Sequence, residues 1–388
     1  MSLPPPLAHL PAPPPEAAAV SAELTRVIQD EIAANGGRLP FRRYMELALY
    51  APGLGYYSAG SRKFGAAGDF ITAPELSPLF GRCLARQVAE LRALGVPDIL
   101  EVGAGSGALA ADLLNALGEA GAAPDRYLIL EVSAELQARQ RETLATRAPR
   151  WADRVTWLAV LPERLHAIVI GNEVLDAIPT ALVRVDADDV RELAVAATPG
   201  GFAWTDLPAA ERLRACIEPW QLPAGYRTEV NLAARAFVMS LARLLERGVL
   251  LFIDYGHPAR DFYHPQRNRG TLMCHYRHHA HDDPLVLPGL QDITAHVDFT
   301  AIAEAGVDAG LEVSGYTHQS TFLINTGLIE LLSAVPADDV ARYAPLASQA
   351  QQLIAPSEMG DRFKVIALAK GITEPLTGFD RGDRTHQL

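Results

Sequence analysis

The chain has little of what marks secreted, membrane-spanning or nucleic-acid-binding proteins. Its three cysteines lie far apart and form no C-x-x-C pair, which argues against a disulfide framework or a zinc ribbon and favours a reducing cytosol. No apolar run approaches the roughly 20 residues that a helix needs to cross a bilayer. The net charge of −12 argues against non-specific binding along nucleic acid. These absences predict a cytoplasmic protein without a membrane or specific nucleic-acid partner.

The first residues also differ from a targeting signal. The proline-rich start has no basic segment followed by an apolar block, and no arginine precedes Arg26, unlike a secretory signal or a mitochondrial presequence. We expect residues 1–20 to be a disordered proline-rich leader. At the other end, we expect residues 373–388 to be a flexible tail.

The stretch around Gly103 is the most informative part of the sequence. The strand-like segment 98–102 is followed by glycines at three alternate positions, Gly103, Gly105 and Gly107, and then by a helix-like segment. A strand, a glycine turn and a helix in this order hold nucleotide-like ligands at the carboxyl edge of a sheet. The glycines let the backbone approach the ligand closely, and the start of the helix offers free amide groups.

An acid near the end of that strand favours S-adenosylmethionine as the ligand. Glu101 can meet the ammonium group of the cofactor's amino-acid end, while backbone amides meet its carboxylate. A nicotinamide or flavin cofactor is the alternative, because Gly103-x-Gly105-x-x-Ala108 also satisfies the dinucleotide pattern. Glu101 argues against a nicotinamide or flavin cofactor, because this acid would repel the pyrophosphate of such a cofactor. The acid that ends the next strand, Glu131, suits two ribose hydroxyls in either case.

A second polar strand end lies further along the chain. An apolar run of strand length ends in Asn172 and Glu173, and Asp176 follows. These groups would project from the same sheet edge beside the glycine turn, where methyl transfer needs groups that align an acceptor. If the acceptor were an arginine guanidinium, Glu173 and Asp176 could grip its planar fork. The structural alternative is that Asn172 caps a short helix and Asp176 is solvated.

The middle of the chain alternates strands and helices. Strands are expected at 98–102, 126–132, 154–158 and 166–171, with helices at 107–118 and 133–146 between them. This alternation predicts an α/β protein with a doubly wound parallel sheet. The expected division is an N-terminal helical and lid segment at 21–95, a first core part at 96–179, an inserted hairpin and cap at 180–228, and a second core part at 229–372 that contains a substrate-side loop at 256–300.

Three further segments leave alternatives open. The glycine- and aromatic-rich residues between Tyr50 and Glu75 form either a lid over the cofactor or an ordered connecting loop. Histidines and acids are dense between His257 and Asp298, but they have no strong ligand spacing, so no metal site is predicted. Apolar residues after Phe322 fit a homodimer face or core packing equally well.

Together these motifs resemble the MidA-like family of class I S-adenosylmethionine-dependent methyltransferases, which includes the mitochondrial complex I assembly-factor arginine methyltransferase. The matching segments span nearly the whole chain, and two are specific to the family: GDFITAPELS from Gly68 and DITAHVDF from Asp292. The resemblance implies a Rossmann-like, seven-stranded core with S-adenosylmethionine as cofactor. For the eukaryotic relative it implies arginine methylation of a respiratory-complex subunit; a bacterial protein, as this composition suggests, could have a different target.

The resemblance also implies roles at the cofactor end of the site. Gly103, Gly105 and Glu131 would bind the cofactor. Asp69 and Phe70 would help to close the site over it.

At the acceptor end, the resemblance implies that Asn172 and Glu173 face the acceptor, and Asn172 also borders the cofactor. Glu229 is a second candidate for gripping a guanidinium, or alternatively an acid at a helix N-terminus favoured by the dipole. The leading hypothesis is therefore a protein methyltransferase that acts on arginine. The alternatives are an assembly or scaffold protein that binds the cofactor without turnover, and a nicotinamide oxidoreductase.

Overall fold

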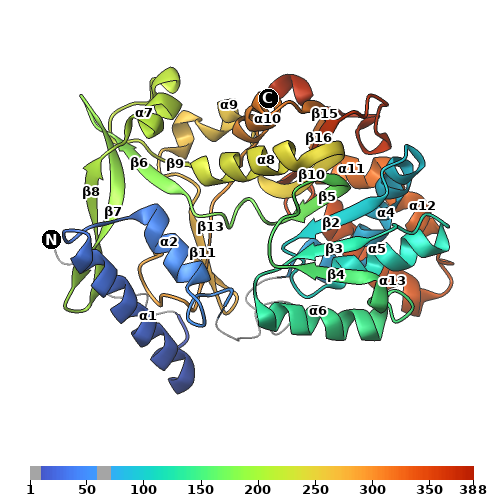
Figure 1. The fold of residues 1–388 in the computed structure, drawn as a ribbon, viewed down its shortest axis with the longest axis horizontal. Coiled ribbons are helices and arrows are strands. Elements are labelled where there is room, and N and C mark those ends of the chain that lie inside the picture. Colours follow the sequence, from blue (N-terminus) through green and yellow to red (C-terminus); the bar gives the residue numbers. More distant parts are fainter. Residues whose placement is uncertain (1–9, 59–70) are drawn as a thin grey trace. The chain divides into compact units, whose positions relative to one another are not determined.

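The computed structural model describes residues 10–58 and 71–388, and contacts divide the chain into two compact units (Figure 1). Unit 1 consists of Met1–Phe70, Ala177–Ala234 and Arg260–His296. Unit 2 consists of Ile71–Asp176, Arg235–Ala259 and Val297–Leu388. Each unit is thus assembled from three separate stretches of sequence.

Among its described residues, unit 2 holds one eight-stranded sheet. Its path is β15-β16-β10-β5-β2-β3-β4, and β14 pairs with β10. The strands from β10 to β4 are parallel, whereas β16 runs antiparallel to both β10 and β15. The strands are β2 Asp98–Val102, β3 Tyr127–Leu130, β4 Val155–Leu158, β5 Leu165–Asn172, β10 Leu245–His257, β14 Val297–Asp298, β15 Glu312–His318 and β16 Phe363–Lys370.

Helices cover both faces of this sheet. One face carries α4 Pro78–Ala93, α5 Ala108–Glu119, α6 Ala134–Arg147, α11 Gln319–Asn325, α12 Leu328–Ser333 and α13 Val340–Ile354, whose buried residues share one cluster with the strands. The other face carries α8 Leu232–Leu244, whose Phe237 ring lies 6.5 Å from the ring of Phe252 on β10. It also carries α10 Phe299–Asp308, where a side chain on Gly306 would meet Leu368 of β16. The predicted doubly wound architecture is confirmed.

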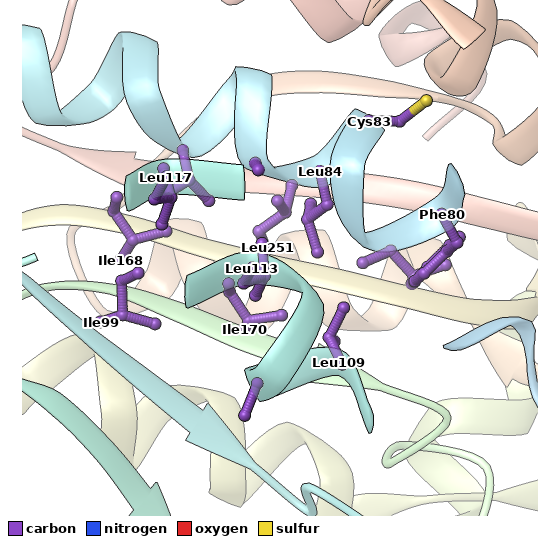
Figure 2. Close-up of a cluster of buried hydrophobic side chains, with 14 of the residues drawn as sticks. Phe80, Cys83, Leu84, Ile99, Leu109, Leu113, Leu117, Ile168, Ile170 and Leu251 are labelled. Atoms are coloured by element: carbon purple, nitrogen blue, oxygen red, sulfur yellow. The ribbon is translucent and has the colours of Figure 1, made fainter. Parts of the chain in front are cut away.

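The core of unit 2 is built from alternate residues of its buried strands. Figure 2 shows Leu109, Leu113 and Leu117 of α5 directed at Ile99, Ile168, Ile170 and Leu251 of the sheet, next to Phe80, Cys83 and Leu84 of α4. All of these side chains are at most 3% exposed. Burying one large aliphatic side chain contributes about 1.5–3 kcal/mol, so this layer holds the strands in register and fixes where their ends lie.

Among its described residues, unit 1 combines two small sheets with four α-helices. The first sheet, which has five strands among the described residues, has the order β1-β7-β6-β9 with β8 beside β7, and the three-stranded sheet has the order β12-β11-β13. The elements are α1 Pro15–Ala34, β1 Leu39–Pro40, α2 Phe41–Tyr50, β6 Ala181–Val185, β7 Val190–Thr198, β8 Gly201–Pro208, α7 Glu211–Ile217, β9 Arg227–Val230, α9 Ala259–Phe262 (which begins on the last residue of a unit 2 segment), β11 Met273–Tyr276, β12 His279–His281 and β13 Asp292–Thr294. Leu24 and Ile28 of α1 share a core with Val195 of β7 and with Cys274 and Ile293 of the small sheet.

Two predicted terminal regions differ from the structure. The helix α1 begins at Pro15, inside the predicted leader, because a proline suits the first turn of a helix. The predicted flexible tail is packed: Phe379 is 6% exposed and its ring lies 5.5 Å from that of Phe322. The Arg384 amide donates to the carbonyl of Tyr316 at 2.7 Å. Apolar residues in a short tail therefore close the end of the core.

Candidate active site

The parallel strands of unit 2 end at one level. In the strand register Val102 is paired with Leu130 and Leu130 with Leu158. On its other side Val102 is paired with Gly171 of β5. The residues just beyond these pairs stay close, because the Glu131 amide donates to the Leu158 carbonyl at 3.2 Å. The structure therefore brings the ends of β2, β3, β4 and β5 to a single carboxyl edge, as the alternation predicted.

The glycine turn after β2 has a left-handed backbone. Gly103, Gly105 and Gly107 have φ of 66°, 52° and 84°, a region that side chains disfavour. A Cβ atom on Gly103 would lie 3.0 Å from Val174 Cγ2, and one on Gly107 would lie 3.1 Å from the Cα of Gln140. Gly107 is the N-cap of α5. The turn thus leaves bare backbone and the first amides of a helix at the edge, which fits the amino-acid and sugar parts of an adenosyl cofactor.

Glu101, the predicted partner of an ammonium group, already has a partner within the chain. The Tyr127 hydroxyl donates to Glu101 Oε2 at 2.6 Å, and Glu101 is 2% exposed. Burial raises the pKa of Glu101 from 4.5 to about 7, partly offset by the Tyr127 hydrogen bond. A cation near this carboxyl group would favour its ionised form.

Glu131 lies one residue beyond β3 and is held from two sides. Its Oε1 accepts from the Ser133 amide at 2.8 Å, and its Oε2 accepts from Nε2 of Gln140 at 3.2 Å. Burial raises the pKa of Glu131, and these hydrogen bonds lower it in part. Sequence reasoning missed Gln140, because a glutamine in a polar helix carries no signal of its position.

At the end of β5, Asn172 and Glu173 contact each other. Asn172 Nδ2 donates to Glu173 Oε1 at 3.2 Å. Glu173 has a φ of 53°, which a residue with a side chain adopts at a cost of about 1–3 kcal/mol. The buried Oδ1 of Asn172 has no hydrogen-bond partner among residues 10–58 and 71–388. Backbone strain and an unsatisfied amide oxygen both occur typically at functional sites.

Asp176 belongs to a buried carboxyl cluster that the sequence did not reveal in full. The Tyr255 hydroxyl donates to Asp176 Oδ2 at 2.5 Å, and Asp176 is 5% exposed. This contradicts the alternative of a solvated Asp176. Asp254 Oδ2 accepts from the amides of residues 174, 175 and 176 at 2.9–3.3 Å. Burial, together with the charges of Asp176 and Glu173, raises the pKa of Asp254 well above its ordinary value.

Asp254 and Tyr255 follow the buried residues Val249 to Ile253 within β10. The register of β10 determines their position, because Ile253 of β10 is paired with Asn172 of β5. Parallel pairing therefore puts residue 254 beside residue 173, although they are 81 positions apart in the chain. An acid and a tyrosine directly after the apolar run 249–253 are the one sequence signal that could have indicated them.

Glu229 belongs to unit 1, whereas the carboxyl edge of the parallel strands belongs to unit 2. It lies on β9, not at a helix N-terminus, so that alternative is wrong. Its Oε1 accepts from the amides of Thr271 and Leu272 at 2.8 and 3.0 Å. A Cβ on Gly270 would lie 2.4 Å from this oxygen. Glu229 therefore fastens the segment at residue 270 to the sheet, and burial raises its pKa.

The predicted lid residues Asp69 and Phe70 lie outside the described residues. The same family-specific segment continues into α3 Ala73–Leu76. There Glu75 accepts a hydrogen bond from the Ser106 hydroxyl of the glycine turn. The part of that segment that the structure describes thus contacts the turn directly.

The histidine-rich segment forms the strands β11 to β13 instead of the predicted loop. In the described parts of the chain, no group of three histidine, cysteine or acidic residues is arranged to hold a metal ion. Nor does any described helix have the length and apolarity to cross a membrane.

Comparison with known proteins identifies the class. A family model for S-adenosyl-L-methionine-dependent methyltransferases matches residues 80–317, and the chain belongs to this family. S-adenosylmethionine is therefore the cofactor, and the nicotinamide alternative is wrong. A crystal structure from Burkholderia thailandensis, bound to S-adenosyl-homocysteine, is 51% identical, covers 98% of this chain and 100% of its own, and superposes with a TM-score of 0.95.

Relatives with lower identity have names that also state the methylated residue. The mitochondrial protein arginine methyltransferase NDUFAF7 of Mus musculus is 29% identical over 86% of this chain and 81% of its own length. Its counterpart in Danio rerio is 28% identical over 86% of this chain and 83% of its own length. The resemblance predicted from the motifs is thereby confirmed: the enzyme is a methyltransferase of the MidA-like type.

Proposed function

We propose that this methyltransferase modifies an arginine side chain of a protein. The observation that carries the proposal is the carboxyl cluster of Glu173, Asp176 and Asp254 at the carboxyl edge that also holds the glycine turn. Three acids this close together at a partly buried strand end raise the free energy of the folded protein unless a cation binds among them. Arginine is the cationic side chain whose planar fork matches carboxylates. The names of the relatives at 28–29% identity support the same acceptor.

At the cofactor end, each predicted residue has a role in this proposal. S-adenosylmethionine, when bound, supplies a methyl group activated by its sulfonium. The backbone at Gly103 and Gly105 and the first amides of α5 after Gly107 would hold its carboxylate. Glu101 would face its ammonium, and Glu131 would accept from the ribose hydroxyls.

At the acceptor end, the acids would bind and orient the guanidinium. Glu173 and Asp176 would each accept from its N–H groups, and the free Oδ1 of Asn172 would accept a further one. Alignment of one nitrogen with the methyl carbon supplies much of the rate acceleration. A carbon–nitrogen bond forms as the carbon–sulfur bond breaks, and the guanidinium then loses one proton to a neighbouring carboxylate. We also place the reaction in the bacterial cytoplasm, since the solved relatives at 50–51% identity come from Burkholderia thailandensis.

The test is transfer of a tritiated methyl group from S-adenosylmethionine into a lysate of a strain that lacks this gene. We expect one labelled protein band that yields methylarginine on hydrolysis, and loss of that label with Glu173→Gln. The matched control is Glu135→Gln, which changes an exposed acid in the first turn of α6. A labelled small molecule without a labelled protein would contradict the protein acceptor. Cofactor binding without any labelling would favour the assembly or scaffold alternative.

A further inference from the structure

One helix that borders the cofactor end carries a buried amide. α6 is polar along most of its length, and its buried residues are Gln140 and Leu144. Gln140 is 0% exposed, which is uncommon for a glutamine. A buried amide costs free energy unless its hydrogen bonds are made. The hydrogen-bond partners of Gln140 therefore indicate its role.

Gln140 contacts three separate segments at the edge of the sheet. Its Nε2 donates to Glu131 Oε2 at 3.2 Å and to the Gly105 carbonyl at 3.1 Å. Its Oε1 accepts from the indole Nε1 of Trp157 at 2.8 Å. One amide thus joins the end of β3, the glycine turn after β2, and β4.

The orientation of the amide follows from the chemistry of its neighbours. An indole N–H can only donate, so the amide oxygen must face Trp157. The NH₂ group must then face Glu131 and the carbonyl of Gly105, both of which are acceptors. Flipping the amide would break all three hydrogen bonds. Arg141 lies over the Trp157 ring at 4.2 Å from its centroid, which helps to hold the indole in place.

We propose that Gln140 is a positioning residue for the ribose of the cofactor. It aims the carboxylate of Glu131 at the position of the ribose hydroxyls and at the same time ties that carboxylate to the glycine turn. Gln140 touches no reacting atom, so its effect passes through Glu131. The inference rests on the ribose role proposed above for Glu131.

The test compares two ligands, S-adenosylhomocysteine and its 2′-deoxyribose analogue, by isothermal titration calorimetry. Gln140→Met keeps the length of the side chain and removes its polar contacts. We expect the Kd of S-adenosylhomocysteine to rise about 10-fold, because a hydrogen bond to a charged group is lost, while the Kd of the 2′-deoxy analogue rises at most about twofold. A merely structural role would weaken both ligands equally.

Two controls make the outcome decisive. Gln137→Met removes a neighbouring bond from the same helix to the backbone carbonyl of Glu131, 2.7 Å long, and should not change the ratio of the two Kd values. Trp157→Phe removes only the donor that orients the amide, and should shift that ratio in the same direction as Gln140→Met by about threefold. It also serves as the readout if Gln140→Met does not fold.

The reference variant is Glu131→Gln. If Glu131→Gln weakens S-adenosylhomocysteine selectively but Gln140→Met and Trp157→Phe leave the ratio unchanged, the inference about Gln140 is wrong and the role of Glu131 stands. If Glu131→Gln itself has no selective effect, the ribose role of Glu131 is wrong, and the inference about Gln140 is overturned with it.

Discussion

The two halves of the carboxyl edge in unit 2 differ in how completely the chain satisfies its own polar groups. In the half formed by β2, β3 and β4, both carboxylate oxygens of Glu131 accept hydrogen bonds, and Gln140 uses both ends of its amide. In the half formed by β5 and β10, the Oδ1 of Asn172 has no partner in the described part of the chain, and Glu173 has a left-handed backbone.

This difference indicates two ways of binding. The first half is preformed, because hydrogen bonds within the chain already orient its polar groups. Cofactor binding therefore needs little ordering of these side chains. The second half places Asp176, Glu173 and Asp254 close together, and burial together with the charges of its two neighbours raises the pKa of Asp254. Such a site is completed by a cation, because a nearby positive charge favours the ionised acids. If the two halves bind their ligands separately, substitutions can damage one half and leave the other intact.

The largest effect is expected from Gly103→Val. A β-branched residue cannot adopt a φ of 66° without strain, and its Cβ would lie 3.0 Å from Val174 Cγ2. We expect the affinity for S-adenosylhomocysteine, measured by calorimetry, to fall more than about 100-fold, or roughly 2.7 kcal/mol. Gly200→Val is the control, because a Cβ there meets nothing within 4 Å. Retained binding by a folded Gly103→Val protein would refute the preformed cofactor half.

Asp254→Ala should separate the halves most clearly. Asp254 holds the turn that carries Asp176, since its Oδ2 accepts from three successive amides. Loss of this anchor displaces the acceptor groups, and a small displacement can lower the rate about 100-fold. We expect methyl transfer into the lysate protein to fall by that factor while the Kd of S-adenosylhomocysteine changes less than about twofold. Parallel losses of binding and transfer would show that the halves are coupled.

Tyr255→Phe is expected to have a smaller effect on the same half. It removes the hydroxyl that donates to Asp176 at 2.5 Å but keeps the ring that packs edge-on against Phe363. Losing one hydrogen bond to a charged group costs about 1.5–3 kcal/mol, so we expect transfer to fall at least about tenfold. Steady-state kinetics with the labelled protein would measure this. An unchanged rate would mean that Asp176 does not need this contact for acceptor binding.

The smallest effect on catalysis is expected from Glu101→Gln, which instead changes the pH dependence of stability. In the folded protein the pKa of Glu101 is about 7, above its ordinary value of 4.5. Between these values the unfolded chain ionises while the folded protein keeps the proton, so the free energy of unfolding falls as pH rises, on the order of 1 kcal/mol per pH unit. Below about pH 4.5 and above about pH 7 this contribution is constant.

Urea unfolding at about pH 5 and about pH 7 measures this slope. We expect the slope to be smaller in Glu101→Gln than in the natural chain, and the affinity for S-adenosylhomocysteine to fall only about threefold, because Tyr127 already shares the Glu101 carboxyl group. Equal slopes in both proteins would mean that Glu101 is ionised throughout this range.

Much of unit 2 could be predicted from local patterns. β2 has the expected bounds of residues 98–102, and β4 begins one residue after the expected strand 154–158, because apolar runs of strand length bounded by turn residues are strong signals. The glycine turn was equally clear, since glycine adopts its left-handed backbone angles without the cost that a side chain adds. Unit 1 was not predicted as a unit, because its three stretches are far apart in sequence and share a core only after folding.

The sequence by itself therefore determined the class of fold, the cofactor and the strand ends that carry Glu131, Asn172 and Glu173, because each depends on residues that are adjacent in the chain. Only the tertiary structure decided which residues hold them. Gln140 reaches Glu131 because a helix packs against the glycine turn, and Asp254 reaches residues 174–176 because two parallel strands are paired in register. Hydrogen bonds between segments depend on packing and register, which no single stretch of sequence contains.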